Sequence, residues 1–158
     1  MLPAAAAAGP GADVPVARTD PNSMQAHRDL LDKRDRGRID LYFIGDSITR
    51  RWGAAEPRHA ALLAHWKQSF HGWNAANFAW GGDTTGNMLW RLDHGELDGL
   101  QPRVIVIMAG TNNLSGALAR MDAGSLAEDV VRGIDALLDR CRRLAPQARI
   151  VLMGITPR

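Results

Sequence analysis

Short apolar runs alternate along the chain with longer segments in which apolar residues recur every three or four positions. The runs span 39–44, 77–80, 104–108 and 150–153. Spacing near 3.6 predicts helices, whereas short apolar runs bounded by glycine predict strands. The run 104–108 is apolar throughout, which is typical of a strand buried on both faces of a parallel sheet. The pattern therefore predicts an α/β fold with a parallel sheet covered by helices.

The first helical segments carry signals at their ends. Asn22 or Ser23 is placed to cap a helix that runs to about Arg34. Pro57 suits the first turn of a second helix, because proline is favoured there. A third helix is expected over roughly 85–92, after a glycine-rich turn.

A longer helix is expected further on. Ser125 with Glu128 forms a capping-box pattern that predicts its start, and Pro146 ends it. Cys141, the single cysteine, lies on the apolar face of this helix. We therefore expect Cys141 to be a buried core residue rather than part of a disulfide.

Polar or small residues follow three of the predicted strands directly. These segments are Gly45-Asp46-Ser47, Gly81-Gly82-Asp83 and Gly110-Thr111-Asn112-Asn113. In open parallel sheets, active sites lie beyond the carboxyl ends of the strands. The coincidence of three such segments is the strongest indication of function in the sequence.

Composition and charge narrow the alternatives. The chain has 158 residues, of which 46% are hydrophobic and 23% charged, as in an ordinary single globular domain. The net charge is +2, and no basic block with interleaved aromatic residues occurs, which argues against a nucleic-acid partner. No apolar run approaches the roughly 18 residues needed to span a bilayer.

Residues 1–20 are rich in Ala, Pro and Gly and are expected to form a flexible leader or the remnant of a signal peptide. The folded domain is then expected over 21–158. Secreted or periplasmic and cytoplasmic locations are equally open, because no basic segment precedes the Ala tract.

Ser47 is a candidate nucleophile. It follows the first predicted strand by a tight turn, where a helix N-terminus favours developing negative charge. The alternative is that Ser47 only caps a helix, which is the commoner role of such a serine. Gly82 and Asn112 could donate N–H groups to a reacting carbonyl oxygen, with the Ser47 N–H as a third donor. Alternatively, the glycines only form a turn and Asn112 only caps one.

Three segments together resemble the first sequence blocks of the SGNH (GDSL-type) hydrolases. They are Gly45-Asp46-Ser47-Ile48-Thr49, Gly82-Asp83-Thr84-Thr85 and Gly110-Thr111-Asn112-Asn113. The longer segment Gly81–Thr85, followed by Leu89-Trp90-Arg91-Leu92, resembles especially the catalytic subunits of platelet-activating-factor acetylhydrolase. The similarity runs from about residue 39 to residue 158.

This resemblance implies a flavodoxin-like three-layer α/β/α sandwich and hydrolysis of esters, often with short acyl groups. It gives Ser47 the role of nucleophile through an acyl-enzyme, and it gives Gly82 and Asn112 the oxyanion roles. Asp46 would brace the turn. No metal or organic cofactor is implied. The substrate would be a small-molecule or glycan ester, and the oligomeric state stays open.

A serine nucleophile needs a base, and in this family the base comes from a late Asp-x-x-His block. No Asp in this chain has a His three positions later. Of the five histidines, His94 is the least unfavourable substitute, although none follows a predicted strand. We therefore expect a domain truncated after the fourth strand, with little activity.

Two other classes of function stay open at this point. The first is a non-catalytic module that binds a carbohydrate or a protein on the same fold, which the absent base favours. The second is a nucleotide-binding domain, since Gly81–Gly86 is a glycine-rich turn before a helix. No Gly-x-Gly-x-x-Gly or Walker pattern follows the first strand, which argues against the second.

Overall fold

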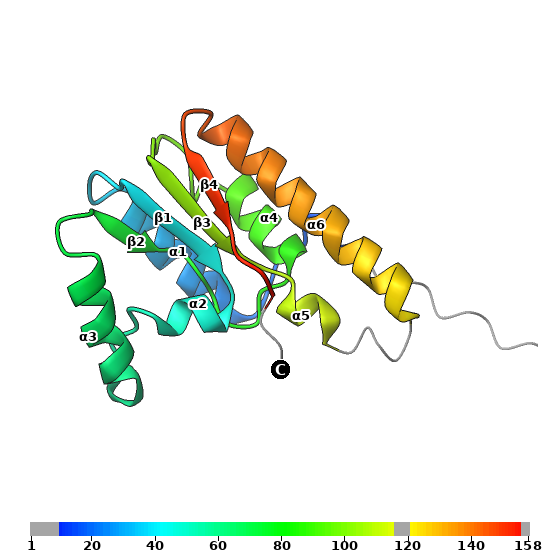
Figure 1. Cartoon of the computed structure of the whole chain (residues 1–158), viewed down its shortest axis with the longest axis horizontal. Helices are drawn as coiled ribbons and strands as arrows, with labels where there is room; N and C mark the ends of the chain where they lie inside the picture. Colours follow the sequence, from blue (N-terminus) through cyan, green and yellow to red (C-terminus); the bar gives the residue numbers. More distant parts are fainter. Residues whose placement is uncertain (1–9, 116–120, 156–158) are drawn as a thin grey trace, which may run out of the picture.

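A computed structural model describes residues 10–115 and 121–155 of the chain (Figure 1). Strands and helices alternate along most of it, as the apolar pattern predicts. The elements are α1 (Pro21–Arg34), β1 (Leu41–Gly45), α2 (Ser47–Arg51), the 3₁₀ helix η1 (Pro57–His59), α3 (Ala60–Ser69), β2 (Ala75–Asn77), α4 (Thr85–Asp93), β3 (Val104–Met108), α5 (Thr111–Leu114), α6 (Ala123–Leu144) and β4 (Arg149–Leu152).

The strands form one parallel sheet in the order β2-β1-β3-β4. In the central pair, Leu41 is level with Val104 and Gly45 with Met108. The carboxyl ends of β1 and β3 therefore stop at the same level. The segments that follow them, α2 and α5, lie at the same end of the sheet (Figure 1). This register places the ends of the two central strands side by side.

One face of the sheet carries the main core. Tyr42 and Ile44 of β1, with Ile105 and Ile107 of β3, are completely buried. They pack against apolar side chains of α1, α4 and α6, among which Cys141 is also fully buried. Burial of each large apolar side chain stabilises the fold by about 1.5–3 kcal/mol. The prediction that Cys141 is a core residue is confirmed.

The opposite face is covered by an aromatic cluster over β1. Phe43 contacts the rings of Trp52, Trp66 and Phe70, with centroid distances of 5.7, 5.1 and 5.3 Å. Trp66 lies on α3 and Phe70 caps its end, so this helix is held to the sheet by ring contacts. Helices thus flank both faces of the sheet, as expected for the predicted α/β fold. Val151, on the edge strand β4, is 48% exposed.

Several predicted element ends are wrong. Asp20, rather than Asn22 or Ser23, caps α1, and Asp122, rather than Ser125, caps α6. In both cases the aspartate accepts a hydrogen bond from the backbone N–H three residues later, which is the geometry of an N-cap. Pro57 begins a 3₁₀ turn, and the α-helix follows it.

The second strand also begins earlier than predicted. β2 spans Ala75–Asn77, whereas the apolar run pointed to 77–80. Phe78 and Trp80 nevertheless donate backbone hydrogen bonds to Phe43 and Gly45, which continues the contact with β1 beyond the strand. The apolar run 77–80 thus marks the buried residues of this segment, whereas the regular β-strand lies mostly before them.

Residues 10–20, expected within a flexible leader, pack on α4 and α6. The Ala12 N–H donates to Asp129 on α6, and the Ala12 carbonyl accepts from the Thr85 hydroxyl at 2.6 Å. Further along, Val16 is joined to Gly86 and Asn87 by hydrogen bonds in both directions. The packed domain therefore begins before residue 21. The predicted leader residues 1–9 lie outside the described part of the chain.

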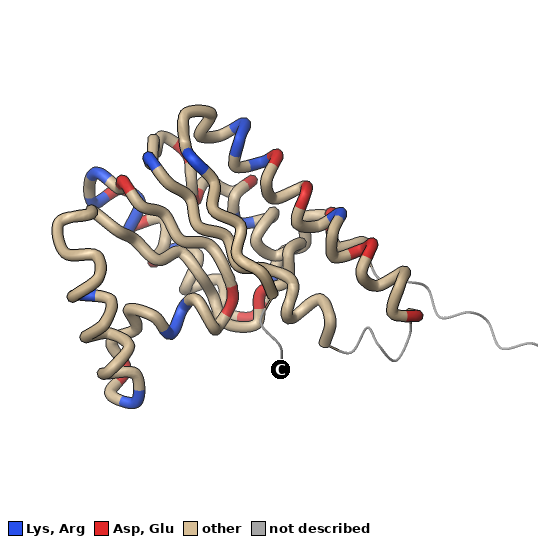
Figure 2. The backbone as a smooth tube through the Cα atoms, in the orientation of Figure 1, with Lys and Arg blue, Asp and Glu red and all other residues tan. Residues whose placement is uncertain are grey.

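Charges of both signs are intermixed along the outer side of α6 (Figure 2). Arg132 pairs with Asp129, and Arg142 with Asp139, one helical turn apart. Within residues 10–115 and 121–155, no helix has the length and apolar character needed to cross a membrane.

Candidate active site

The three polar segments singled out in the sequence follow β1, β2 and β3. Because β1 lies between β2 and β3 in the sheet, Ser47 lies between the other two segments. Gly81 is directly beside it: a Cβ atom placed on Gly81 would lie 3.7 Å from the Ser47 Cβ. The parallel topology therefore brings these segments together, as the strand-end rule predicts.

Asp46 caps α2 and shapes the turn before Ser47. Its carboxylate is buried and accepts a hydrogen bond of 2.8 Å from the Ile48 N–H. The alternative that Ser47 is the helix cap is therefore wrong, because Asp46 occupies that position. The Ser47 side chain is half-buried and forms no hydrogen bond with the described residues. Its hydroxyl is thus left for another partner.

Gly82 adopts a backbone conformation that favours glycine. Its φ is +84°, in the left-handed region where a Cβ is unfavourable. The residue is exposed, so a ligand can approach its backbone. The preceding carbonyl, that of Gly81, accepts a hydrogen bond of 2.6 Å from the Arg18 guanidinium. The peptide that precedes Gly82 is therefore held by Arg18, which lies in the segment before α1.

Asn112 joins the second and third segments. Its Nδ2 donates to the Asp83 carbonyl oxygen at 2.9 Å, and it does not cap α5, which begins after Gly110. An amide nitrogen carries two hydrogens, so one remains for a ligand. The alternative that Asn112 only caps a turn is therefore wrong, because its side chain links the two segments.

A buried ionic network lies behind these segments, and the sequence pattern did not indicate it. Arg91 pairs with Glu96 through both carboxylate oxygens at 3.1 and 2.9 Å, and Glu96 also contacts His27 at 2.8 Å. Arg91 Nε lies 2.9 Å from Asp83 Oδ2, although the two are not aligned for a hydrogen bond. Arg18 approaches Asp83 from the other side.

Asp83 has a perturbed acidity in this network. Burial raises the pKa of its carboxyl to about 6, against the opposing effect of the Arg91 and Arg18 charges. The network was missed because its members are spread over an early loop, two helices and a turn. The only signal was the presence of Arg91 on an otherwise apolar face of its helix.

The structure does not place His94, the least unfavourable substitute base in the sequence, beside the candidate site. His94 lies at the C-terminal end of α4, stacked on Trp90, while Thr84 caps the other end near Gly82. A helix of 9 residues separates the two ends by about 14 Å. His27 is engaged with Glu96, and His65 accepts a hydrogen bond from Trp52. His94 is therefore not placed to act on Ser47.

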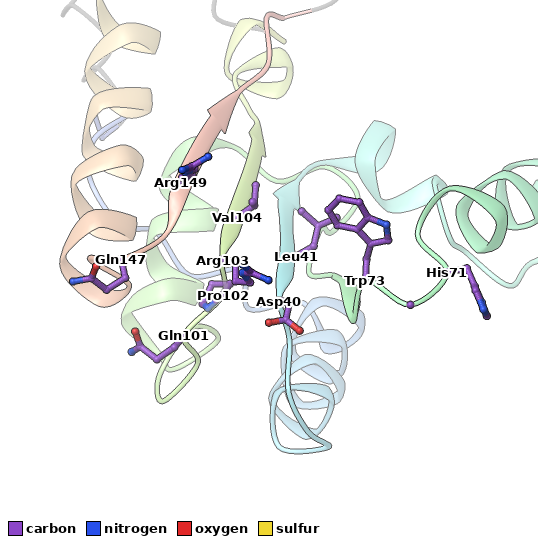
Figure 3. Close-up of a pocket in the computed structure, with 11 residues that line it drawn as sticks. Asp40, Leu41, His71, Trp73, Gln101, Pro102, Arg103, Val104, Gln147 and Arg149 are labelled. Atoms are coloured by element: carbon purple, nitrogen blue, oxygen red, sulfur yellow. The ribbon is translucent and has the colours of Figure 1, made fainter.

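A pocket of about 730 Å³ lies at the opposite edge of the sheet (Figure 3). Leu41, Val104 and Arg149 line its floor at the start of three strands, and Trp73 stands to one side. The pocket lies at the amino ends of the strands, whereas the three polar segments follow their carboxyl ends. We therefore place the candidate site at Ser47 rather than in this pocket. Among the described residues, no cluster of three or more His, Cys, Asp or Glu could hold a metal ion.

Comparison with known proteins shows the family to which the chain belongs. Residues 43–158 match the model of the GDSL-like Lipase/Acylhydrolase family. The chain is 36% identical over 132 residues to the platelet-activating factor acetylhydrolase IB subunit alpha1 of Rattus norvegicus, which covers 84% of this chain and 49% of that protein. It is 37% identical over 134 residues to the alpha2 subunit of Homo sapiens, covering 85% of this chain and 51% of that protein.

The fold has relatives among solved structures. A Streptococcus pneumonia protein, described as a candidate platelet activating factor, superposes with a TM-score of 0.57 at 20% identity, covering 85% of this chain and 55% of that one. The chain spans about half the length of the curated relatives it matches. On the family match and these identities, the chain belongs to the GDSL-like lipase/acylhydrolase family, the SGNH hydrolases.

Proposed function

We propose that the chain carries the acyl-transfer half of an SGNH esterase site, with Ser47 as nucleophile. The observation that carries this proposal is the position of Ser47. Its hydroxyl forms no hydrogen bond with the described residues, and it lies beside Gly81, between the segments after β2 and β3. A serine in this position attacks the acyl carbon of an ester, the alcohol leaves, and water then releases the acid from the acyl-enzyme.

Negative charge develops on the carbonyl oxygen of the ester during the attack, and hydrogen-bond donors that already point toward this oxygen stabilise it. The backbone N–H groups of Ser47 and Gly82 and the second hydrogen of Asn112 Nδ2 supply three such donors in this proposal. Asp46 braces the turn through its bond to Ile48. Removal of one oxyanion donor typically lowers the rate by about 10²–10³-fold.

We also propose that this 158-residue chain alone reacts slowly. No Asp is followed three positions later by a His, and His27, His65 and His94 have other partners. Loss of the base of a serine triad lowers the rate by about 10⁴–10⁶-fold, while the oxyanion donors retain part of the catalysis.

For the substrate we propose esters with short acyl groups. The names of the relatives, acetylhydrolases, point to an acetyl ester. The alcohol portion, whether a small molecule or a glycan, has no counterpart among the described contacts.

Labelling by a fluorophosphonate, measured by intact mass, tests the nucleophile. We expect one adduct on the parent chain and none on Ser47→Ala. Ser69→Ala is the matched control, since the Ser69 hydroxyl lies 3.4 Å from His65 in an exposed pair. Labelling that persists in Ser47→Ala and disappears in Ser69→Ala would contradict the proposal. No labelling of the parent at millimolar probe favours the non-catalytic binding module.

p-Nitrophenyl acetate and p-nitrophenyl octanoate test the acyl preference. We expect slow hydrolysis of the acetate that depends on Ser47, and a lower rate with the octanoate. A preference for the octanoate would contradict the proposal of a short acyl group, while leaving the role of Ser47 intact.

A further inference from the structure

Arg18 contacts the segment after β2 from a part of the chain that precedes α1. Its Nη1 donates to the Gly81 carbonyl oxygen at 2.6 Å and lies 3.4 Å from Asp83 Oδ1. A Cβ placed on Gly82 would lie 3.1 Å from the same nitrogen. The guanidinium therefore lies against the Gly81–Gly82 peptide itself.

This contact has a directional consequence. No cis peptide bond occurs among the described residues, so the Gly81–Gly82 peptide is trans. In a trans peptide the carbonyl and the N–H of the following residue point in opposite directions within one plane. Arg18 holds the carbonyl, and the Gly82 N–H must then point away from Arg18.

Two successive glycines leave this peptide with few restraints of its own, apart from the hydrogen bond of 3.4 Å from the Asp83 N–H to the Trp80 carbonyl that closes the turn. Glycine has the widest range of backbone conformations, and fixing one residue costs roughly 1–2 kcal/mol of conformational entropy. The Gly81–Gly82 pair has no side chains with which to pack. A charged hydrogen bond to Gly81 is stronger than a neutral one, so it can restrict this peptide.

Arg18 is itself fixed from both sides. Asp20 lies 3.4 Å from its Nε, and Asp83 is buried against Arg91 of α4. The segment before Arg18 is anchored as well. The Val16 N–H donates to the Gly86 carbonyl, and the Val16 carbonyl accepts from the Asn87 side chain. The guanidinium is therefore held by the Gly81 carbonyl and flanked by the carboxylates of Asp20 and Asp83.

We propose that Arg18 is a positioning residue, which holds the Gly81–Gly82 peptide so that the Gly82 N–H faces the acyl oxygen above Ser47. This inference rests on the proposed function of Ser47 and adds to it a residue outside the family's motif segments. Arg18 acts through the peptide and does not touch the substrate. It also gives the segment before α1 a role at the candidate site.

The test compares Arg18→Met with Arg18→Lys, which keeps the charge. We expect Arg18→Met to lower the Ser47-dependent rate with p-nitrophenyl acetate or fluorophosphonate by about 10–100-fold, with little change in KM. Lysine should restore part of the rate. Arg38→Met is the matched control, because Arg38 pairs with Asp40 at the other edge of the sheet and should leave the rate unchanged.

The ¹⁵N order parameter of the Gly82 amide gives an independent readout. We expect about 0.85 in the parent chain and in Arg18→Lys, and below about 0.6 in Arg18→Met. An unchanged rate with an unchanged order parameter overturns the proposal, and so does a lower rate that appears only together with global unfolding by circular dichroism. If the parent shows no Ser47-dependent reaction, the proposed function fails, and the Gly82 order parameter alone decides whether Arg18 holds the peptide.

Discussion

The side chain of Asn113 binds Thr85 through both ends of its amide. Its Oδ1 accepts the Thr85 N–H at 3.0 Å, and its Nδ2 donates to the Thr85 hydroxyl at 2.9 Å. Asn113 follows β3, whereas Thr85 begins α4, so this pair joins two of the three segments at the candidate site. Asn112 adds a second link through the Asp83 carbonyl. The spacing between Gly82 and Asn112 is thus set by neighbouring residues.

Asn113→Ala should lower the free energy of unfolding by about 1–3 kcal/mol, because it leaves the buried Thr85 N–H without a partner. Urea denaturation measures this loss. Gln25→Ala is the control, since Gln25 forms only exposed side-chain bonds on α1 and should change stability by less than about 0.5 kcal/mol. A loss for Asn113→Ala no larger than that of the control would show that the pair is not a structural link.

The regular core and the meeting of the three segments could be predicted from sequence. β3 spans the predicted run 104–108, because a continuous apolar stretch between Arg103 and the turn at Gly110 permits few other placements. The approach of Gly81 to Ser47 follows from parallel strands that end at one edge. The first inference depends on a pattern within a single strand, and the second on the general rule that parallel strands end together.

Helix caps and the ionic network could not be predicted in this way. Asp20 and Asn22 are both good cap residues two positions apart, and tertiary packing decides between them. The Arg91–Glu96 pair depends on how α4 packs, which no local pattern states. Residues 10–20 read as a leader because their composition is poor in large apolar side chains, while their order comes from hydrogen bonds to α4 and α6.

Gly133→Ala should destabilise the chain through a close contact with the segment before α1. A Cβ on Gly133 would lie 2.7 Å from the Ala12 carbonyl oxygen and 2.5 Å from the Thr85 Oγ1. Overpacking of this kind typically costs about 1–3 kcal/mol, more than the roughly 1 kcal/mol that alanine gains over glycine in a helix. Thermal denaturation measures the difference.

Gly124→Ala is the matched control on the same helix. Its nearest neighbour would be an Asp122 side-chain oxygen at 3.3 Å, and the residue is exposed. We expect this variant to be neutral or slightly more stable. If both glycine variants had the same stability, Ala12 would not be packed against α6 in solution.

The Asp83 carboxyl should make the stability of the chain depend on pH in an unusual direction. Its pKa of about 6 in the folded chain lies above the ordinary value of 3.8, because burial penalises the charged form. The folded chain therefore binds this proton more tightly than the unfolded chain. The contribution of Asp83 to the free energy of unfolding rises as pH falls from about 6 to about 4, by roughly 2–3 kcal/mol, and is lost as pH rises through 6.

Chemical denaturation between pH 4 and 7 measures this dependence. Asp83→Asn should remove it, because the amide does not titrate. Asp40→Asn is the control: hydrogen bonds from Asn74 and Arg38 lower the pKa of Asp40 below 3.8, so its contribution is constant between pH 4 and 7 and this variant should keep the pH dependence of the parent. An Asp83→Asn variant with the same pH dependence as the parent would rule out Asp83 as the source.

Asn112→Asp should slow the reaction of Ser47 while preserving the size of the side chain. A carboxylate has no hydrogen to give to an acyl oxygen, and it would face the Asp83 carbonyl, its present partner at 2.9 Å, with a second acceptor. We expect the rate of Ser47 labelling to fall by at least about 10²-fold, as for removal of one oxyanion donor. Asn112→Ala separates the two causes, because it removes the donor without adding repulsion. Equal rates in both variants and the parent would exclude Asn112 from the oxyanion site and leave it as a link between loops.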